Sequence, residues 1–177
     1  WNKGDRITLL YDGQAVSVET VAAGGISELS GSVEGTFTDS NPLYGVYPAD
    51  NAVSSTYESV TVSIPATQTA EGDGYDAKAA VSVARTVSES LTFHTIGGGI
   101  KLNFQMSGVT KVELESVDGY ALAGTAMIKW DEQGTPVVAE TKNAASILVL
   151  NAADDSGLTP GKDYYISTLP CDLYGGY

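Results

Sequence analysis

The chain has 177 residues, which is enough for one domain or two small ones. Nine basic residues against 22 acidic ones give a net charge of −13, which excludes a nucleic-acid binder with a dense basic face and a peripheral binder of anionic membranes. The hydrophobic share of 42% excludes a disordered chain, and about a quarter of the residues are the β-branched Val, Ile or Thr. With 20 glycines available for turns, this composition predicts an acidic, all-β protein.

Apolar residues recur mostly at every second position, the period of a strand with one buried face. The clearest case is Ile100, Leu102, Phe104 and Met106, which alternate with polar residues. The continuous apolar run at 147–150 predicts a strand buried on both faces. In chain order, strands are expected at residues 7–11, 15–21, 32–38, 43–47, 60–64, 81–83, 91–95, 100–106, 112–114, 121–130, 147–150 and 164–169.

Turn residues separate these runs, since pairs of Gly with Asp, Ser or Gly stand between them, where positive φ costs little. Residues 66–78 are polar and predict an exposed loop, and residues 143–146 are the best candidate for a helical turn. About a dozen short strands at close spacing predict a sandwich or a barrel. We expect residues 1–177 to form a single domain.

The two ends of the chain suggest a piece of a longer protein. Trp1 opens the sequence without a Met or an export signal, and Tyr177 closes it where another strand could begin. We therefore expect a trimmed, mature segment. No run approaches the ~18 apolar residues of a membrane-spanning helix.

Side chains that could carry catalysis are scarce. His94 is the single histidine, and it lies in phase with Thr92 rather than with the apolar face, so we expect a partly exposed strand histidine and no catalytic triad. Cys171 is the single cysteine and is expected to fill a small apolar space near a strand end. The glycines at 97–99 lead into a strand and not a helix, which predicts a hairpin or bulge and not a phosphate loop. No catalytic residue is predicted.

Acidic residues gather at two places. Glu71, Asp73 and Asp76 have a spacing that can hold calcium, but they lack the order of a known calcium loop, so a solvated loop is favoured. Asp154 and Asp155 stand beside a Ser-Gly pair and predict a turn. Neither a metal site nor a cofactor site is predicted.

Six short stretches follow one another in order along nearly the whole chain. They are residues 1–7 (WNKGDRI), 44–48 (YGVYP), 62–68 (VSIPATQ), 91–102 (LTFHTIGGGIKL), 112–124 (VELESVDGYALAG) and 164–170 (YYISTLP). This set resembles motifs of the Bacteroidetes fimbrillin-like (type V pilin) family, including its W-x-x-G-D-x-I entry strand and its strand ending in Tyr-Pro.

The resemblance implies a Greek-key, transthyretin-like two-sheet β-sandwich with very little helix, serving as the N-terminal domain of a pilin, tip or anchor subunit. It implies export as a lipoprotein to the outer membrane or a fimbrium, proteolytic removal of an N-terminal segment, and assembly by β-strand addition. The implied partners are other pilus subunits and an adhesion target, either a glycan or a protein on a host or bacterial surface. Such a module is not an enzyme, and the fragment alone is expected to be monomeric.

Two other functions stay open. A carbohydrate-binding domain of a surface lipoprotein is the first, because ten tyrosines with Trp1 and Trp130 supply aromatic rings that stack on sugars. A hydrolase is the second, since 22 acidic residues allow many carboxylate pairs, although nothing in the sequence singles out one pair.

Overall fold

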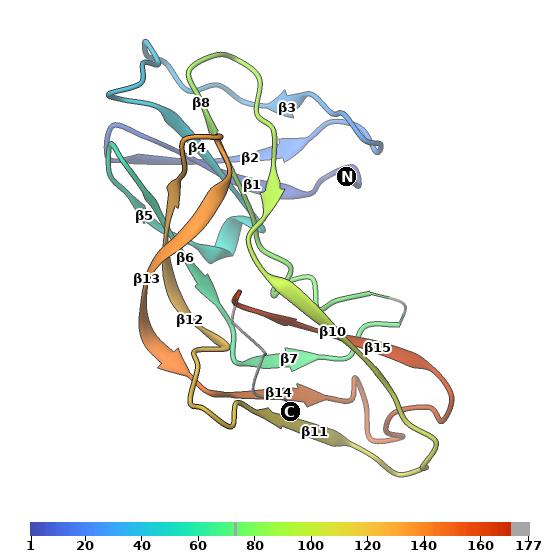
Figure 1. Cartoon of the computed structure of the whole chain (residues 1–177). Helices are drawn as coiled ribbons and strands as arrows, with labels where there is room; N and C mark the ends of the chain where they lie inside the picture. Colours follow the sequence, from blue (N-terminus) through green and yellow to red (C-terminus); the bar gives the residue numbers. More distant parts are fainter. Residues whose placement is uncertain (73, 171–177) are drawn as a thin grey trace. The chain divides into compact units, whose positions relative to one another are not determined.

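A computed structural model describes residues 1–72 and 74–170 of the chain (Figure 1). These residues group into two compact units. Unit 1 comprises Trp1–Val62, Val81–Ile96 and Met127–Glu140, and unit 2 comprises Ser63–Ala80, Gly97–Ala126 and the chain from Thr141 onward. The division into two compact units does not test the expectation that residues 1–177 form one domain, which stays a prediction.

The regular structure of the described residues is almost entirely β, with one short 3-10 helix, η1 (Ala49–Asn51). The prediction of an all-β sandwich with very little helix is therefore confirmed, whereas the Greek-key, transthyretin-like order of the strands stays a prediction. The strands are β1 (Arg6–Tyr11), β2 (Gln14–Thr20), β3 (Leu29–Ser30), β4 (Leu43–Tyr47), β5 (Ala52–Ser55), β6 (Val60–Ile64), β7 (Thr67–Thr69), β8 (Ser82–Thr86), β9 (His94–Thr95), β10 (Gly98–Asn103), β11 (Lys111–Glu115), β12 (Ala123–Trp130), β13 (Pro136–Ala145), β14 (Ile147–Asn151) and β15 (Asp163–Thr168).

Unit 1 contains a six-stranded sheet in the order β3-β2-β1-β4-β8-β9, with every neighbouring pair antiparallel. The β1–β2 hairpin is closed by Asp12 and Gly13, whose φ angles of 48° and 73° are those that the tightest hairpin turns require. Each end of the sheet is a two-residue strand, so its longer members β2 and β8 are covered along only part of their outer edges by strands among the described residues.

Strand β4 lies in the interior of this sheet, and both of its faces are buried. Tyr44 and Val46 point to one face and are 1% and 0% exposed. The Tyr44 ring packs on Trp130 with 5.3 Å between centroids, and its hydroxyl donates to the Tyr57 carbonyl at 3.2 Å. This side of the sheet is therefore closed by side chains of unit 1, and the opposite side carries the site described below.

Unit 2 contains the antiparallel pair β10-β15 and the three-stranded sheet β11-β14-β7, in which β14 and β7 run parallel. Gln68 of β7 connects the two sheets. Its Nε2 donates to the Ser167 carbonyl of β15 at 2.7 Å, and its Oε1 accepts from the Ser167 N–H at 2.9 Å. The Gln68 side chain thus pairs with both backbone groups of Ser167 at a buried position, as a neighbouring strand would.

A fourth sheet has the order β13-β12-β6-β5, and β6, β12 and β13 have residues in both units. The sequence did not predict β13. Instead it predicted a helical turn at residues 143–146, which is wrong: β13 continues to Ala145, with Asn143 at a φ of 50° inside it.

Two other expected strands are corrected. Residues 32–38 form no strand among the described residues, and only an isolated bridge joins Thr38 to Asn41. Of residues 91–95, only His94 and Thr95 pair, as β9. Residues 91–93 keep the burial alternation of a strand, whereas residues 34–36 are all exposed, and neither stretch has a partner strand in the described part of the chain.

The run at 147–150 is also corrected, because it is buried on one face only. Leu148 and Leu150 are 0% exposed, but Ile147 is 42% exposed. Strand β14 has paired neighbours on both edges, which does not require both faces to be covered.

The polar stretch 66–78 is not simply an exposed loop, because its first part forms β7 and buries Gln68. The glycines at 97–99 do not close a hairpin, since β9 pairs with β8 while β10 pairs with β15. Gly97 and Gly99 are close-approach residues instead. A Cβ on Gly97 would stand 2.5 Å from the Thr168 carbonyl oxygen, and a Cβ on Gly99 would overlap the ring of Tyr75.

Candidate functional site

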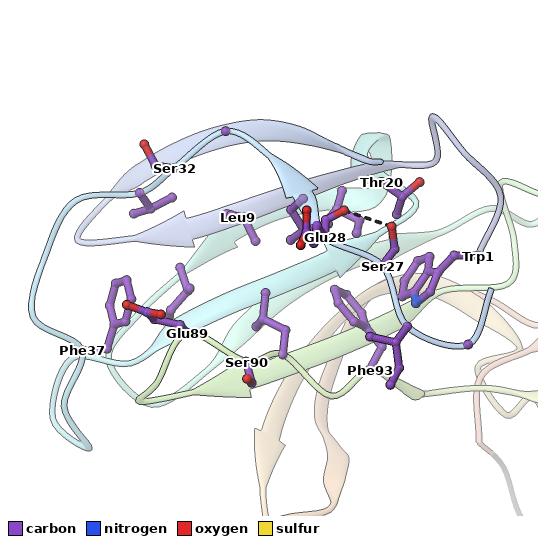
Figure 2. A pocket seen from close by; sticks show the side chains of 18 residues that line it. Trp1, Leu9, Thr20, Ser27, Glu28, Ser32, Phe37, Glu89, Ser90 and Phe93 are labelled. Atoms are coloured by element: carbon purple, nitrogen blue, oxygen red, sulfur yellow. Dashed lines mark hydrogen bonds between the residues drawn. The ribbon is translucent and has the colours of Figure 1, made fainter. Parts of the chain in front are cut away.

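An apolar pocket of about 600 Å³, called the groove below, lies on one face of the six-stranded sheet in unit 1 (Figure 2). Ile7 and Leu9 of β1 and Leu43 of β4 form its floor, and each is at most 5% exposed. They belong to one core cluster together with Val18 of β2. The period-two alternation of β1, together with Leu43 of β4, therefore builds a preformed apolar floor.

Residues 25–37 form the first wall of the groove. Val33 and Phe37 are half-buried and line it, while the residues between them are exposed. Phe37 packs edge-on against Tyr11 of β1 with 4.9 Å between ring centroids. A Cβ on Gly35 would overlap the Tyr11 ring, so a glycine at this point lets the wall lie close to the sheet.

Residues 89–93 form the second wall. Leu91 and Phe93 are half-buried and line the groove, and Thr92 between them is exposed. The Phe93 ring lies over Gly45 of β4, where a Cβ would stand 2.8 Å from its Cζ atom. Trp1 meets the Phe93 ring edge-on at 5.1 Å, so an aromatic pair closes one end of the groove (Figure 2).

Both walls share one property. Half-buried apolar side chains line the groove from both walls, Val33 and Phe37 on one side and Leu91 and Phe93 on the other. Neither residues 32–37 nor residues 91–93 pair with a neighbouring strand among the described residues. The groove is thus the space between two segments without partner strands, above an apolar floor.

The charge at the groove is acidic. Glu28 and Glu89 are its charged lining residues, and both are exposed. The Ser27 hydroxyl donates to the Glu28 carbonyl at 3.0 Å, the bond drawn in Figure 2. Beside these residues Ile26 is 93% exposed, which is unusual for a large apolar side chain. The mouth of the groove therefore combines negative charge with exposed apolar surface.

Two tyrosines of β4 stay uncharged at ordinary pH. Burial raises the pKa of Tyr44, and the nearby Arg85 offsets part of that effect. Burial also raises the pKa of Tyr47, and the Asp5 carboxylate raises it further. The strand beneath the groove therefore brings no negative charge of its own.

His94 is exposed in β9, as the sequence predicts. With Trp130 it lines a second, polar cleft of unit 1, separate from the groove. Trp1, the other tryptophan considered for sugar stacking, lines the groove instead. The sequence thus named residues of both sites but did not group them.

The acidic residues have structural roles where they are described. One carboxylate oxygen of Asp76 accepts from the Thr69 N–H at 2.7 Å and the other from the Lys78 N–H at 2.8 Å, which organises the chain after β7. Glu71 is exposed, and Asp73 lies outside the described residues. Over residues 1–72 and 74–170, no group of three or more His, Cys, Asp or Glu side chains is placed to hold a metal ion.

Asp154 organises a turn, as predicted. Its Oδ1 accepts from the Ser156 N–H at 2.8 Å, and its hydrogen bonds to Ser156 lower the pKa of the carboxyl. Cys171 lies outside the described residues.

Sequence reasoning missed the groove because pairing partners are non-local. Residues 32–38 were predicted as a strand, and in the structure two of their apolar side chains, Val33 and Phe37, do face the groove. Alternation reports which side chains face a core, but it does not report whether another strand lies alongside. A predicted strand that lacks a partner strand is the signal that could have pointed to the groove.

Comparison of the chain with family models, curated proteins and solved structures finds no match. Within the described residues, no helix has both the length and the apolar character needed to cross a membrane. The site is therefore interpreted from its own geometry.

Proposed function

We propose that this chain is a non-enzymatic structural module of a bacterial cell-surface fimbria, acting as a pilin, tip or anchor subunit, and that its groove takes up a β-strand of another subunit. The observation that carries the proposal is the position of the groove between two segments, residues 32–37 and 91–93, that have no partner strand among the described residues. Unsatisfied strand edges beside an apolar floor are what strand addition uses.

An inserted strand fits the groove for two reasons. Its backbone N–H and C=O groups would find hydrogen-bond partners along the walls, and its alternate side chains would cover Ile7, Leu9 and Leu43. Covering these apolar side chains would stabilise the inserted strand by about 25 cal/mol for each Å² of apolar surface buried. A compact small molecule would cover the apolar floor without pairing with the backbone of residues 32–37 and 91–93.

Charge favours a specific occupant over random association. The net charge of −13 opposes contact between copies, and Glu28 and Glu89 extend this field to the groove. A donor strand with apolar residues facing inward and a Lys or Arg near the mouth would be complementary. On this proposal the chain works outside the cell, at the outer membrane or in the fimbrium, and its partners are other pilus subunits.

The test is assembly of the full-length protein after proteolytic trimming, followed by light scattering and negative-stain electron microscopy. We expect large species and filaments. Ser90 is exposed and lines the groove, so Ser90→Trp should fill it and block assembly without removing a core side chain. The matched control is Ser54→Trp, on an exposed position of β5 away from the groove, which should assemble normally.

Thermal unfolding of both variants shows whether each is folded. A trimmed protein that stays monomeric and forms no filament would contradict the proposal. Filament formation by Ser90→Trp at the rate of the control would show that assembly does not use the groove.

A further inference from the structure

A second cleft of unit 1, of about 610 Å³, differs in chemistry from the groove. It is lined by aromatic and polar side chains from separate parts of unit 1: Tyr57 from the β5–β6 connection, Arg85 from β8, His94 from β9, and Lys129 and Trp130 from β12. The second wall of the groove supplies alternate residues to each site. Leu91 and Phe93 face the groove, and Thr92 and His94 face the cleft.

The aromatic residues of the cleft are held in place through Tyr44. Trp130 packs on the Tyr44 ring at 5.3 Å with an interplanar angle of 36°. The Tyr44 hydroxyl donates to the Tyr57 carbonyl at 3.2 Å, which fixes the backbone that carries the Tyr57 ring. Tyr57 is 61% exposed. A rigid indole and an exposed phenol ring therefore face one polar cavity.

Two ion pairs fix the charged side chains at the cleft. Arg85 Nη2 donates to the Asp39 carbonyl at 3.1 Å and lies 3.5 Å from its carboxylate. Lys129 Nζ lies 3.4 Å from the Glu58 carboxylate. Both cations are thus matched by acids that also line the cleft, so neither offers an uncompensated positive charge.

The remaining lining acids are Asp131 and Glu132. Asp131 Oδ1 accepts from the Gln133 N–H at 3.0 Å and from the Thr135 N–H at 2.8 Å, which closes the turn between β12 and β13. With four acids against two cations, the cleft is net negative and disfavours anionic ligands. Within the described part of the chain, the His94 ring, the Trp130 indole N–H and the Tyr57 hydroxyl make no hydrogen bond, so they are free to bind a ligand.

We propose that this cleft binds a neutral oligosaccharide. Sugar rings present a C–H face that packs on aromatic rings and hydroxyl groups that both donate and accept hydrogen bonds. Trp130 and Tyr57 supply the aromatic surfaces, and His94 with the paired acids supplies acceptors and donors around them. The inference does not depend on the fimbrial role, because it uses side chains that do not line the groove.

The test is binding of the purified chain to a glycan array, with affinities of the bound glycans then measured by calorimetry. We expect saturable binding to uncharged glycans. Tyr57→Ala and His94→Ala change exposed side chains and should each weaken binding, by about tenfold or more for Tyr57→Ala. Tyr120→Ala, a tyrosine of unit 2 that is 47% exposed, is the matched control and should bind as the parent does.

Trp130→Ala is a less specific probe, because loss of the indole also removes its packing on Tyr44. Three outcomes would overturn the proposal: no saturable binding to any neutral glycan, binding restricted to sialylated or sulfated glycans, or binding that Tyr57→Ala and His94→Ala both leave unchanged.

Discussion

The Phe93 ring lies over Gly45 so closely that a Cβ on Gly45 would stand 2.8 Å from Phe93 Cζ. Gly45 is opposite Ala84 of β8 in the sheet register, so two small residues side by side make room for the ring. Through this contact, a position in the middle of the sheet determines how near the second wall lies to the floor of the groove.

Gly45→Ala should therefore destabilise unit 1 and displace Phe93. Because the added methyl group would stand 2.8 Å from the ring, which then has to move, we expect a loss of about 1–3 kcal/mol in the free energy of unfolding. Urea denaturation measures the loss, and near-UV circular dichroism reports the displacement of the Trp1–Phe93 pair.

The control for this variant is Gly98→Ala in β10, where a Cβ meets nothing within 4 Å. It should change the free energy of unfolding by less than about 0.5 kcal/mol. Equal effects of the two variants would mean that the contact with Phe93 does not determine the result.

Gln68→Leu should be strongly destabilising because it leaves the N–H and C=O of Ser167 unpaired in the interior. Each buried, unsatisfied group costs about 1–3 kcal/mol, so we expect a total of at least about 2 kcal/mol by urea denaturation. Gln133→Leu, on an exposed turn, is the control and should be close to neutral. A small effect of Gln68→Leu would show that unit 2 repacks around the change.

Tyr44 should make the protein sensitive to alkali. An unfolded tyrosine ionises near pH 10, but burial raises the pKa of Tyr44 in the folded chain. Between these two pKa values the folded state binds more protons than the unfolded state, so stability is unaffected below about pH 10 and falls as the pH rises through the folded pKa.

Unfolding free energies measured from pH 8 to 11.5 test this dependence. Tyr44→Phe should have a lower stability at pH 8, because it loses the hydrogen bond to the Tyr57 carbonyl, and a shallower decline above pH 10. Tyr120→Phe, on an exposed side chain, should follow the parent curve. A Tyr44→Phe curve parallel to that of the parent would contradict the assignment of the alkaline decline to Tyr44.

The sequence predicted those strands whose apolar alternation and whose end signals both lie in neighbouring residues. Strands at 43–47 and 60–64 have the predicted bounds, since Pro42 precedes the first and Pro65 ends the second. It missed β13, where polar residues such as Glu140 and Lys142 hide any apolar period. It also misread 66–78, because nothing local shows that Gln68 is buried and bonded to Ser167, 99 residues away.

The same limit applies to the two candidate sites: the sequence shows their residue types but not which residues meet in space. His94 and Trp130 stood out by residue type, but their meeting in one cleft depends on strand order, which alternation does not encode. Parts of the groove walls, residues 32–38 and 91–95, were predicted as strands. Their lack of partners is a property of the whole fold, so only the structure revealed the groove between them.

The central claim is that a strand of another subunit pairs with the walls of the groove, and hydrogen–deuterium exchange of the backbone amides tests it most directly. In assembled filaments, we predict that amides at 32–37 and 91–93 become protected relative to the trimmed monomer. New protection confined to the outer edge of β2, at Ala15 and Ser17, with none in the walls, would contradict the claim.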